Sequence, residues 1–256
     1  MPNDSIIKTI IVAFLLCVFC SVLVSSSAIY LKPLQEKNKL LETKKNILIA
    51  SGLMEEGKTI EEMFKQITVR IIDLKTGEFD DEIDPSQYDV KKAIKDPLLA
   101  YKIPKDLDLA KIKRRAKSVP VYLVMKEDQI DTVILPIYGK GLWSTMYAFL
   151  ALEGDTNTVK GLSFYEHAET PGLGGEVDNE LWKKSWKGKK VFSPDWAPVI
   201  DLPKAKVDPQ RPEAIHQVDG LSGATLTTRG VKNLLRYWLG ENGYGPFLAN
   251  LRQQGV

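Results

Sequence analysis

One stretch of this 256-residue chain combines hydroxyl groups and small residues just before a regular helical pattern. It covers residues 219–228, with the sequence DGLSGATLTT. Small residues, hydroxyls and the free amides at the start of a helix together form a site suited to a phosphate group. The stretch lacks the lysine that follows the glycines of a P-loop. Ser and Thr are also favoured helix caps, so a plain cap without a ligand remains an alternative.

A second stretch, residues 164–176 (FYEHAETPGLGGE), combines a proline and three glycines with ionisable side chains. Its glycines would let the backbone approach a planar ligand closely, although a sharp connection without a ligand has the same composition. His167 could also act as a base for Ser222, with Glu166 or Glu169 as the orienting carboxylate. No Gly-x-Ser-x-Gly elbow presents Ser222 as a nucleophile, which disfavours a hydrolase.

The elements that must position these stretches follow from hydrophobic spacing. Apolar residues recur after the first stretch at i, i+3, i+4, i+7 and i+8, which predicts an amphipathic helix over 231–239 that closes at Gly240 and Gly243. A strand is predicted over 68–74. Two hairpins are predicted, the first over 119–125 and 130–137 and the second over 147–152 and 159–165. Successive strands joined by tight turns give an antiparallel sheet, and with flanking helices the fold class is α+β.

The N-terminus carries a candidate membrane anchor. Residues 9–31 contain no charge, and a helix of that length spans about 34 Å, enough for a hydrocarbon core of about 30 Å. A cleaved signal peptide is the alternative, with Lys8 as its charged start and Ser26-Ser27-Ala28 as its cleavage site. The apolar run continues past Ala28 to Leu31, which favours the anchor.

We therefore divide the chain into a tail with a transmembrane anchor, 1–31, and a domain, 32–256, whose residues 32–52 form a juxtamembrane helix. Cys17 and Cys20, the only cysteines, lie inside the apolar run, where they are expected to be small apolar fillers.

The sequence gives opposing indications of the side of the membrane on which the domain lies. Lysines after the span favour a cytoplasmic domain, whereas the absence of cysteine beyond it suits an oxidising compartment. The net charge of +2 argues against a nucleic-acid binder, and two cysteines cannot form a four-ligand zinc site.

At the two stretches described first, the sequence resembles the covalent FMN-binding domains, in which the Thr after Ser-Gly-Ala carries FMN through its phosphate. Together with residues 141–147 (GLWSTMY), the pattern is similar to the C subunits of the sodium-translocating NADH:quinone reductases of bacterial inner membranes. The strong part of the resemblance runs from about Pro136 to Trp238. Ala168 departs from it, because a glycine is expected there.

The resemblance implies FMN joined by a phosphoester to Thr225, no catalytic residue, no metal, and an electron carrier without turnover of its own. It implies further FMN contacts from Ser222, Gly223, Ala224, Leu142, Trp143, Glu169, Thr170, Leu173 and Gly174. The implied partners are a flavin transferase, the membrane, and the other subunits of a complex that oxidises NADH, reduces ubiquinone and transports Na⁺, with this domain in the periplasm. Thr227 and Thr228 are expected to cap the helix. Two alternatives are the related flavoprotein subunit of a ferredoxin-linked electron transport complex and a membrane-anchored binding module without cofactor.

Overall fold

The computed structural model describes residues 6–254, which fall into two compact units divided between Thr43 and Lys44. Helix α1 (Ile6–Ser51) runs from the first unit into the second. It joins in one helix the membrane span and the juxtamembrane helix that the sequence predicts separately, and Pro33 lies inside it. The expected boundary at residues 31–32 therefore falls within a continuous helix, and the compact second unit begins twelve residues later.

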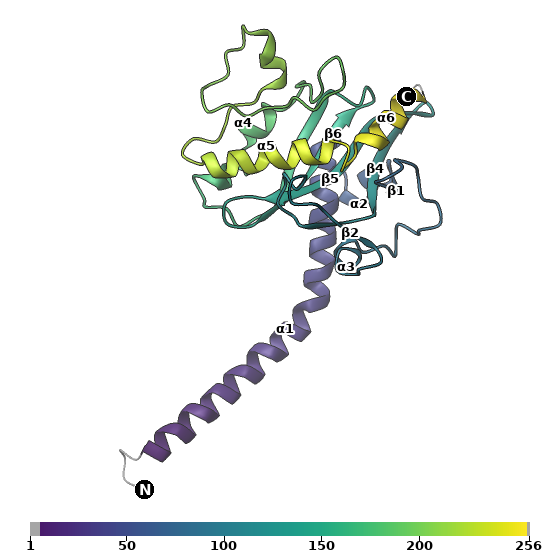
Figure 1. The fold of residues 1–256 in the computed structure, drawn as a ribbon. Helices are drawn as coiled ribbons and strands as arrows, with labels where there is room; N and C mark the ends of the chain where they lie inside the picture. The colour runs from purple at the N-terminus through teal and green to yellow at the C-terminus, as the bar shows by residue number, and fades with distance from the viewer. Residues whose placement is uncertain (1–5, 255–256) are drawn as a thin grey trace. The chain divides into compact units, whose positions relative to one another are not determined.

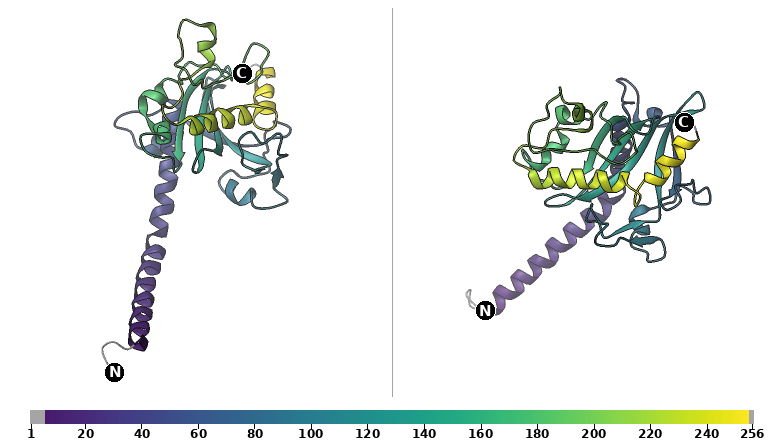
Figure 2. Two further views of the ribbon diagram at one scale, coloured as in Figure 1. Left: turned by 60° about the vertical axis from the view of Figure 1, so that its left-hand side comes forward. Right: turned by 45° about the horizontal axis from the view of Figure 1, so that its top comes forward.

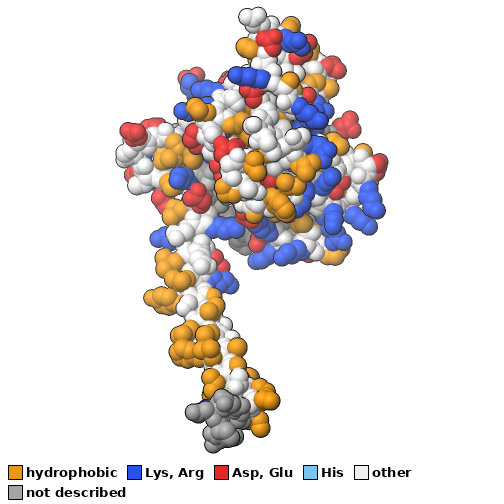
Figure 3. Space-filling view, turned by 90° about the vertical axis from the view of Figure 1, so that its left-hand side faces the viewer, with side chains coloured by type: hydrophobic (Ala, Val, Ile, Leu, Met, Phe, Trp, Pro, Cys, Tyr) orange, Lys and Arg blue, Asp and Glu red, His pale blue; other side chains and the backbone are white. Residues whose placement is uncertain are grey.

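The first unit consists of the apolar part of α1. Its most apolar 18-residue window has a mean hydropathy of 2.7, and none of that window is buried. Apolar side chains cover this part of the helix, whereas the surface of the second unit carries many charged side chains (Figure 3). Cys17 and Cys20 are exposed on it as free thiols. Within residues 6–254, this helix is the one long and apolar enough to cross a membrane.

The second unit is built on a five-stranded antiparallel sheet in the order β1-β4-β5-β6-β7 (Figure 1). Its strands are β1 (Ile67–Asp73), β4 (Ser118–Lys126), β5 (Gln129–Lys140), β6 (Thr145–Glu153) and β7 (Val159–Glu166). The predicted strand and both predicted hairpins are confirmed, each within a few residues. A separate two-stranded ribbon pairs β2 (Ala100–Lys102) with β3 (Arg114–Ala116).

Helices cover the sheet, which confirms the α+β class. The short helices are α2 (Ile60–Phe64), α3 (Val90–Ala93), α4 (Glu180–Lys184) and the 3₁₀ turns η1 (Gly174–Asp178) and η2 (Pro212–His216). Helices α5 (Thr225–Leu239) and α6 (Gly245–Gln253) lie across one face of the sheet (Figures 1 and 2). On that face Leu135 and Ile137 of β5 belong to one buried cluster with Leu234 and Trp238.

The opposite face is covered by the last turns of α1 and by α2. Ile47 and Leu48 of α1 and Met63 of α2 form a second buried cluster with Ile134 and Phe149 of the sheet. Ile134 lies between residues of β5 that face α5, so the two-residue period of the strand places apolar side chains on both faces. The sheet is therefore the middle layer of this unit.

Strand β5 fixes the position of α5. The indole Nε1 of Trp238 donates to the Tyr138 carbonyl oxygen at 2.7 Å. A Cβ on Gly139 would lie 2.5 Å from Cβ of Leu234, so the helix backbone comes close to the strand because residue 139 has no side chain. Gly230 likewise allows α5 to approach the Lys140 carbonyl oxygen. As a result, the first turn of α5 lies near the β5–β6 connection.

Truncation of the α5 side chain at this contact should destabilise the second unit. Leu234 is fully buried, and Leu234→Ala is expected to lower the free energy of unfolding by about 2–5 kcal/mol. Arg229→Ala, on the exposed side of the same helix, should change it by less than about 0.5 kcal/mol. Urea titration of the full chain in detergent, followed by tryptophan fluorescence, measures both. Equal midpoints for the two variants would contradict this account of how α5 is held.

Candidate functional site

Three segments that are far apart in the sequence meet at the start of α5. They are the β5–β6 loop (141–144), the loop after β7 (167–175) and the loop before α5 (219–224). The first stretch singled out from the sequence thus forms one wall, and the second stretch forms another. We call this region the three-loop site.

The carboxylate of Glu169 joins two of these walls. Its Oε1 accepts hydrogen bonds from the backbone amides of Trp143 at 3.0 Å and Ser144 at 3.2 Å. Its Oε2 accepts from the amide of Leu142 at 3.2 Å and from the Thr227 hydroxyl, in the first turn of α5, at 2.6 Å. A single buried side chain therefore ties the β5–β6 loop to α5.

Glu169 carries its charge at neutral pH although its side chain is buried, with 5% of the residue exposed. Burial raises the pKa of this carboxyl, but the hydrogen bonds from the Thr227 hydroxyl and from the three loop amides outweigh it. The resulting pKa lies below the ordinary value of 4.5. Hydrogen bonds to the ionised form, rather than a neighbouring cation, stabilise the charge.

Two glycines make room for this arrangement. A Cβ on Gly141 would lie 2.5 Å from Oε1 of Glu169. A Cβ on Gly174 would lie 2.5 Å from the Thr227 hydroxyl oxygen and 2.9 Å from Oε2 of Glu169. These positions need glycine because any side chain would occupy the space of the carboxylate and its donors.

His167 supports the loop and does not face Ser222. Its Nε2 lies 2.8 Å from Oδ2 of Asp178, and its Nδ1 accepts the backbone N–H of Glu169 at 3.2 Å. The hydrogen bond to Asp178 raises the pKa of His167. Both ring nitrogens are engaged in these contacts, so the geometry gives no support to the hydrolase alternative.

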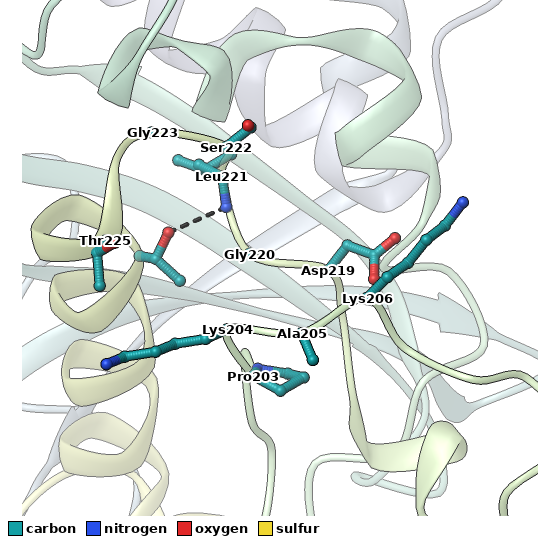
Figure 4. A pocket seen from close by; sticks show the side chains of 11 residues that line it. Pro203, Lys204, Ala205, Lys206, Asp219, Gly220, Leu221, Ser222, Gly223 and Thr225 are labelled. Carbon is teal, nitrogen blue, oxygen red and sulfur yellow. Dashed lines mark hydrogen bonds between the residues drawn. The ribbon is translucent and has the colours of Figure 1, made fainter.

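The loop before α5 borders a cavity of about 480 Å³ (Figure 4). Its lining residues are Pro203, Lys204, Ala205, Lys206, Asp219, Gly220, Leu221, Ser222, Gly223, Thr225 and Thr228. Thr225 is exposed and is the first residue of α5. The N–H groups of residues 225–227 have no intrahelical acceptor, and no side chain caps the helix. Lys204 extends toward α5, whereas Lys206 extends past Asp219 and away from Thr225 (Figure 4). Lys204 and the helix start therefore provide positive charge on the Thr225 side of the cavity.

The expectation that Thr227 and Thr228 cap α5 is wrong. The N-cap is Ala224, and both threonines are buried within the first turn of the helix. The Thr227 hydroxyl donates to Glu169, and Oγ1 of Thr228 accepts the backbone N–H of Leu221 at 3.0 Å (Figure 4). These hydroxyls hold the adjoining loops because they face inward, whereas a capping side chain precedes the first turn.

Apolar side chains are exposed around the three-loop site. Leu142 and Trp143 of the β5–β6 loop are 41% and 67% exposed, and Leu173 of the loop after β7 is 44% exposed. Trp143 is thus a surface residue and not part of the core. A Cβ on Gly223 would lie 3.0 Å from Cδ2 of Leu173, so the loops before α5 and after β7 lie in close proximity.

Lys204 and Lys206 are site residues that the sequence patterns do not predict, and they line the cavity from a segment without regular structure. Their spacing from Thr225 carries no local signal, and only the folded chain brings them to the same cavity. All ten predicted contact residues lie on the three loops or at the start of α5, and Ala224 is the buried N-cap.

Removal of the Glu169 charge should change how stability depends on pH. Because the folded-state pKa of Glu169 is lowered, its contribution is fully present above about pH 4.5 and is lost as pH falls through the folded-state value. Glu169→Gln should lower the free energy of unfolding at pH 7 by about 1.5–3 kcal/mol, with a smaller difference at pH 3. Urea titrations at both pH values measure this. A difference that is independent of pH would show that the carboxylate charge does not stabilise the fold.

Comparisons with known proteins place this chain in a family. Residues 141–240 match the FMN-binding domain family. The chain is 49% identical to the C subunit of the Na(+)-translocating NADH-quinone reductase of Pseudomonas aeruginosa, over 98% of each protein, and 47% identical to that of Vibrio anguillarum, over 99% of this chain and 98% of the relative. The crystal structure of Shewanella oneidensis NqrC matches with a TM-score of 0.78 and 35% identity, covering 85% of this chain and 99% of that one. The chain therefore belongs to the family of Na(+)-translocating NADH-quinone reductase C subunits.

Proposed function

We propose that this chain is the FMN-carrying electron-transfer subunit of a complex that oxidises NADH, reduces ubiquinone and transports Na⁺. The observation that carries the proposal is the exposed Thr225 at an uncapped helix start, within the residues that match the FMN-binding domain family. Electron transfer is the chemistry that bound FMN supplies. The residues of this chain bind the phosphate and hold the ring, and none of them is assigned a catalytic role, so no turnover by the isolated subunit is expected.

The cavity beside Thr225 fits a phosphate. Lys204, which extends toward α5 (Figure 4), supplies positive charge, and the first-turn amides of α5 supply donors. Asp219 lies in the same cavity, but its Oδ1 accepts the backbone N–H of Val207 at 2.7 Å. We infer that Ser222, Gly223 and Ala224 surround the phosphate of FMN.

The pattern of hydroxyl contacts supports Thr225 as the attachment residue. Four hydroxyls occur in residues 222–228, and those of Thr227 and Thr228 are engaged in buried hydrogen bonds. Ser222 and Thr225 remain exposed. Of these two, Thr225 is within the helical turn whose amides point toward an anion, so a phosphoester there would be stabilised by the helix start.

The exposed apolar rim fits the flavin ring. Leu142, Trp143 and Leu173 offer apolar surface for the planar ring system. The Thr170 carbonyl oxygen accepts the amides of Leu173 and Gly175, which makes a tight turn beside Gly174. We propose that Thr170 and Gly174 contact the ring through this turn and that Glu169 supports it.

Covalent attachment suits a carrier that passes electrons and releases no product, because the cofactor cannot then be lost. Formation of the phosphoester requires a flavin transferase as a maturation partner. A binding module without cofactor would need no exposed threonine beside cationic side chains. The ferredoxin-linked alternative is less favoured, because the relatives reported above are subunits of NADH-quinone reductases.

We propose that α1 anchors the subunit in the bacterial inner membrane through residues 9–31 and that the domain of residues 32–256 faces the periplasm. The cysteine-free sequence after Leu31 supports this side of the membrane. The lysines that follow the span oppose it, but large domains can be translocated regardless of flanking charge.

Substitution of the attachment residue should remove the cofactor and leave the fold intact. Thr225→Ala in the full chain, co-expressed with a flavin transferase, is expected to give folded and colourless protein without the FMN mass. Thr225 is exposed, so little change in stability is expected. Intact mass and flavin absorbance measure the result.

Thr227→Ala and Thr228→Ala are the matched controls, because their hydroxyls hold protein contacts. Both should retain the FMN mass and lose about 1 kcal/mol of stability. Peptide mass spectrometry that places FMN on another residue, or full flavinylation of Thr225→Ala, would overturn the assignment.

The periplasmic side can be tested with reporters fused to the C-terminus of the full chain. An alkaline phosphatase fusion should be active, since that enzyme needs an oxidising compartment for its disulfides. A β-galactosidase fusion at the same position should be inactive. The reverse pattern would show that the lysines after the span determine the orientation.

A further inference from the structure

Glu169 links the two halves of the three-loop site, and its role there builds on the proposed function. We propose that Glu169 is a positioning residue that fixes the ring-side loop 142–144 to the flavin-bearing turn of α5. It would thereby set the mobility and the reduction potential of the flavin without using its own oxygens to bind it, in place of the direct FMN contact that the resemblance implies for Glu169.

The acceptor capacity of Glu169 is already used by the protein. A carboxylate has about four lone-pair sites. Three backbone amides and the Thr227 hydroxyl donate to it, two donors at each oxygen. A flavin group would have to displace one of these buried donors in order to bind the carboxylate, so the role of Glu169 is to hold other residues in place.

The groups that Glu169 connects belong to two different parts of the proposed flavin site. The amides of Leu142 and Trp143 belong to residues whose exposed side chains form the ring-side rim. Thr227 lies two residues after Thr225 in the same helical turn. The carboxylate is therefore the direct link between the proposed ring contacts and the proposed phosphate attachment.

Neighbouring residues brace this link. The backbone N–H of Ala168 donates to Oγ of Ser144 at 2.8 Å, which adds a second connection between the same two loops. The absence of side chains at Gly141 and Gly174 lets the carboxylate lie against both loops, because a Cβ at either position would overlap it. A buried carboxylate with four donors keeps its position, because alternative rotamers would leave a buried charge without donors.

Within residues 6–254, no Lys or Arg forms an ion pair with Glu169, and its four hydrogen-bond donors are neutral dipoles. The negative charge of Glu169 contributes to the raised pKa of the neighbouring His167, so a protonated His167 would offset part of that charge. A negative charge near the flavin disfavours the addition of electrons to it. Glu169 should therefore hold the reduction potential of the flavin lower than a neutral residue would.

The experiment uses the full chain, co-expressed with a flavin transferase and purified in detergent. Glu169→Gln removes the charge and keeps the side-chain length, whereas Glu169→Asp keeps the charge on a shorter side chain. Thr227→Val removes the hydroxyl, and Thr227→Ser retains it. Glu176→Gln is the matched control, since Glu176 lies in η1 directly after the loop that contains Glu169 and its Oε2 accepts from Nδ2 of Asn179. Intact mass, flavin midpoint potential and flavin fluorescence anisotropy are measured for each.

All five variants should carry the FMN mass. Glu169→Gln should shift the midpoint potential to a more positive value and lower the anisotropy. Glu169→Asp and Thr227→Val keep the charge but break the link, so both should lower the anisotropy with a smaller shift in potential. Thr227→Ser and Glu176→Gln should match the wild type.

A flavinylated Glu169→Gln with the wild-type potential and anisotropy would overturn the inference. If that variant does not fold, the Thr227 pair decides, because equal anisotropy in Thr227→Val and Thr227→Ser would show that the link does not position the flavin. Absence of the FMN mass from the wild-type chain would instead overturn the proposed function, so the two failures are distinguishable.

Discussion

A buried carboxylate must receive hydrogen bonds from the protein, and in this domain that requirement is met by segments far apart in the sequence. Glu169 takes three donors from residues 142–144 and one from Thr227, which lies 58 residues further along the chain. Such a group without donors would be costly to bury, so the folded state with all four contacts is strongly preferred over a looser arrangement. The geometry of the whole site follows from this constraint.

The sheet holds the first turn of α5 close to the 141–144 loop, so that Glu169 can contact both. Helix α5 lies against β5 through Leu234 and Trp238, and Gly139 allows the close approach. Because the strand leads directly into the 141–144 loop, the helix that packs on it presents its first turn to the same loop. Packing in the core therefore determines where the polar site is formed, and the polar contacts then fix its details.

Local patterns in the sequence were sufficient for the elements and for the location of the site. The apolar runs of β4–β7, separated by turn residues, and the apolar period of α5 report burial directly, so both were predictable. The roles of Thr227, Thr228 and Lys204 were not, because each depends on a partner or cavity that only the fold assembles. A threonine at a helix start resembles a cap in sequence, and its inward orientation is a tertiary property. The sequence places a boundary at residues 31–32 because the apolar run ends at Leu31, whereas the backbone remains helical through Pro33 to Ser51.

Residues 222–228 have two roles, because some of their hydroxyl groups are hydrogen-bonded within the protein and others are exposed. In residues 222–228, the inward hydroxyls stabilise the loops and the outward ones face solvent. The helix period separates them, since residues 225 and 227 point about 200° apart around the axis. Thr227 and Thr228 thus hold the loops in place, and the neighbouring Thr225 stays available for modification. A site built in this way can hold its shape whether or not the exposed threonine is modified, because the contacts that define the shape do not include that residue.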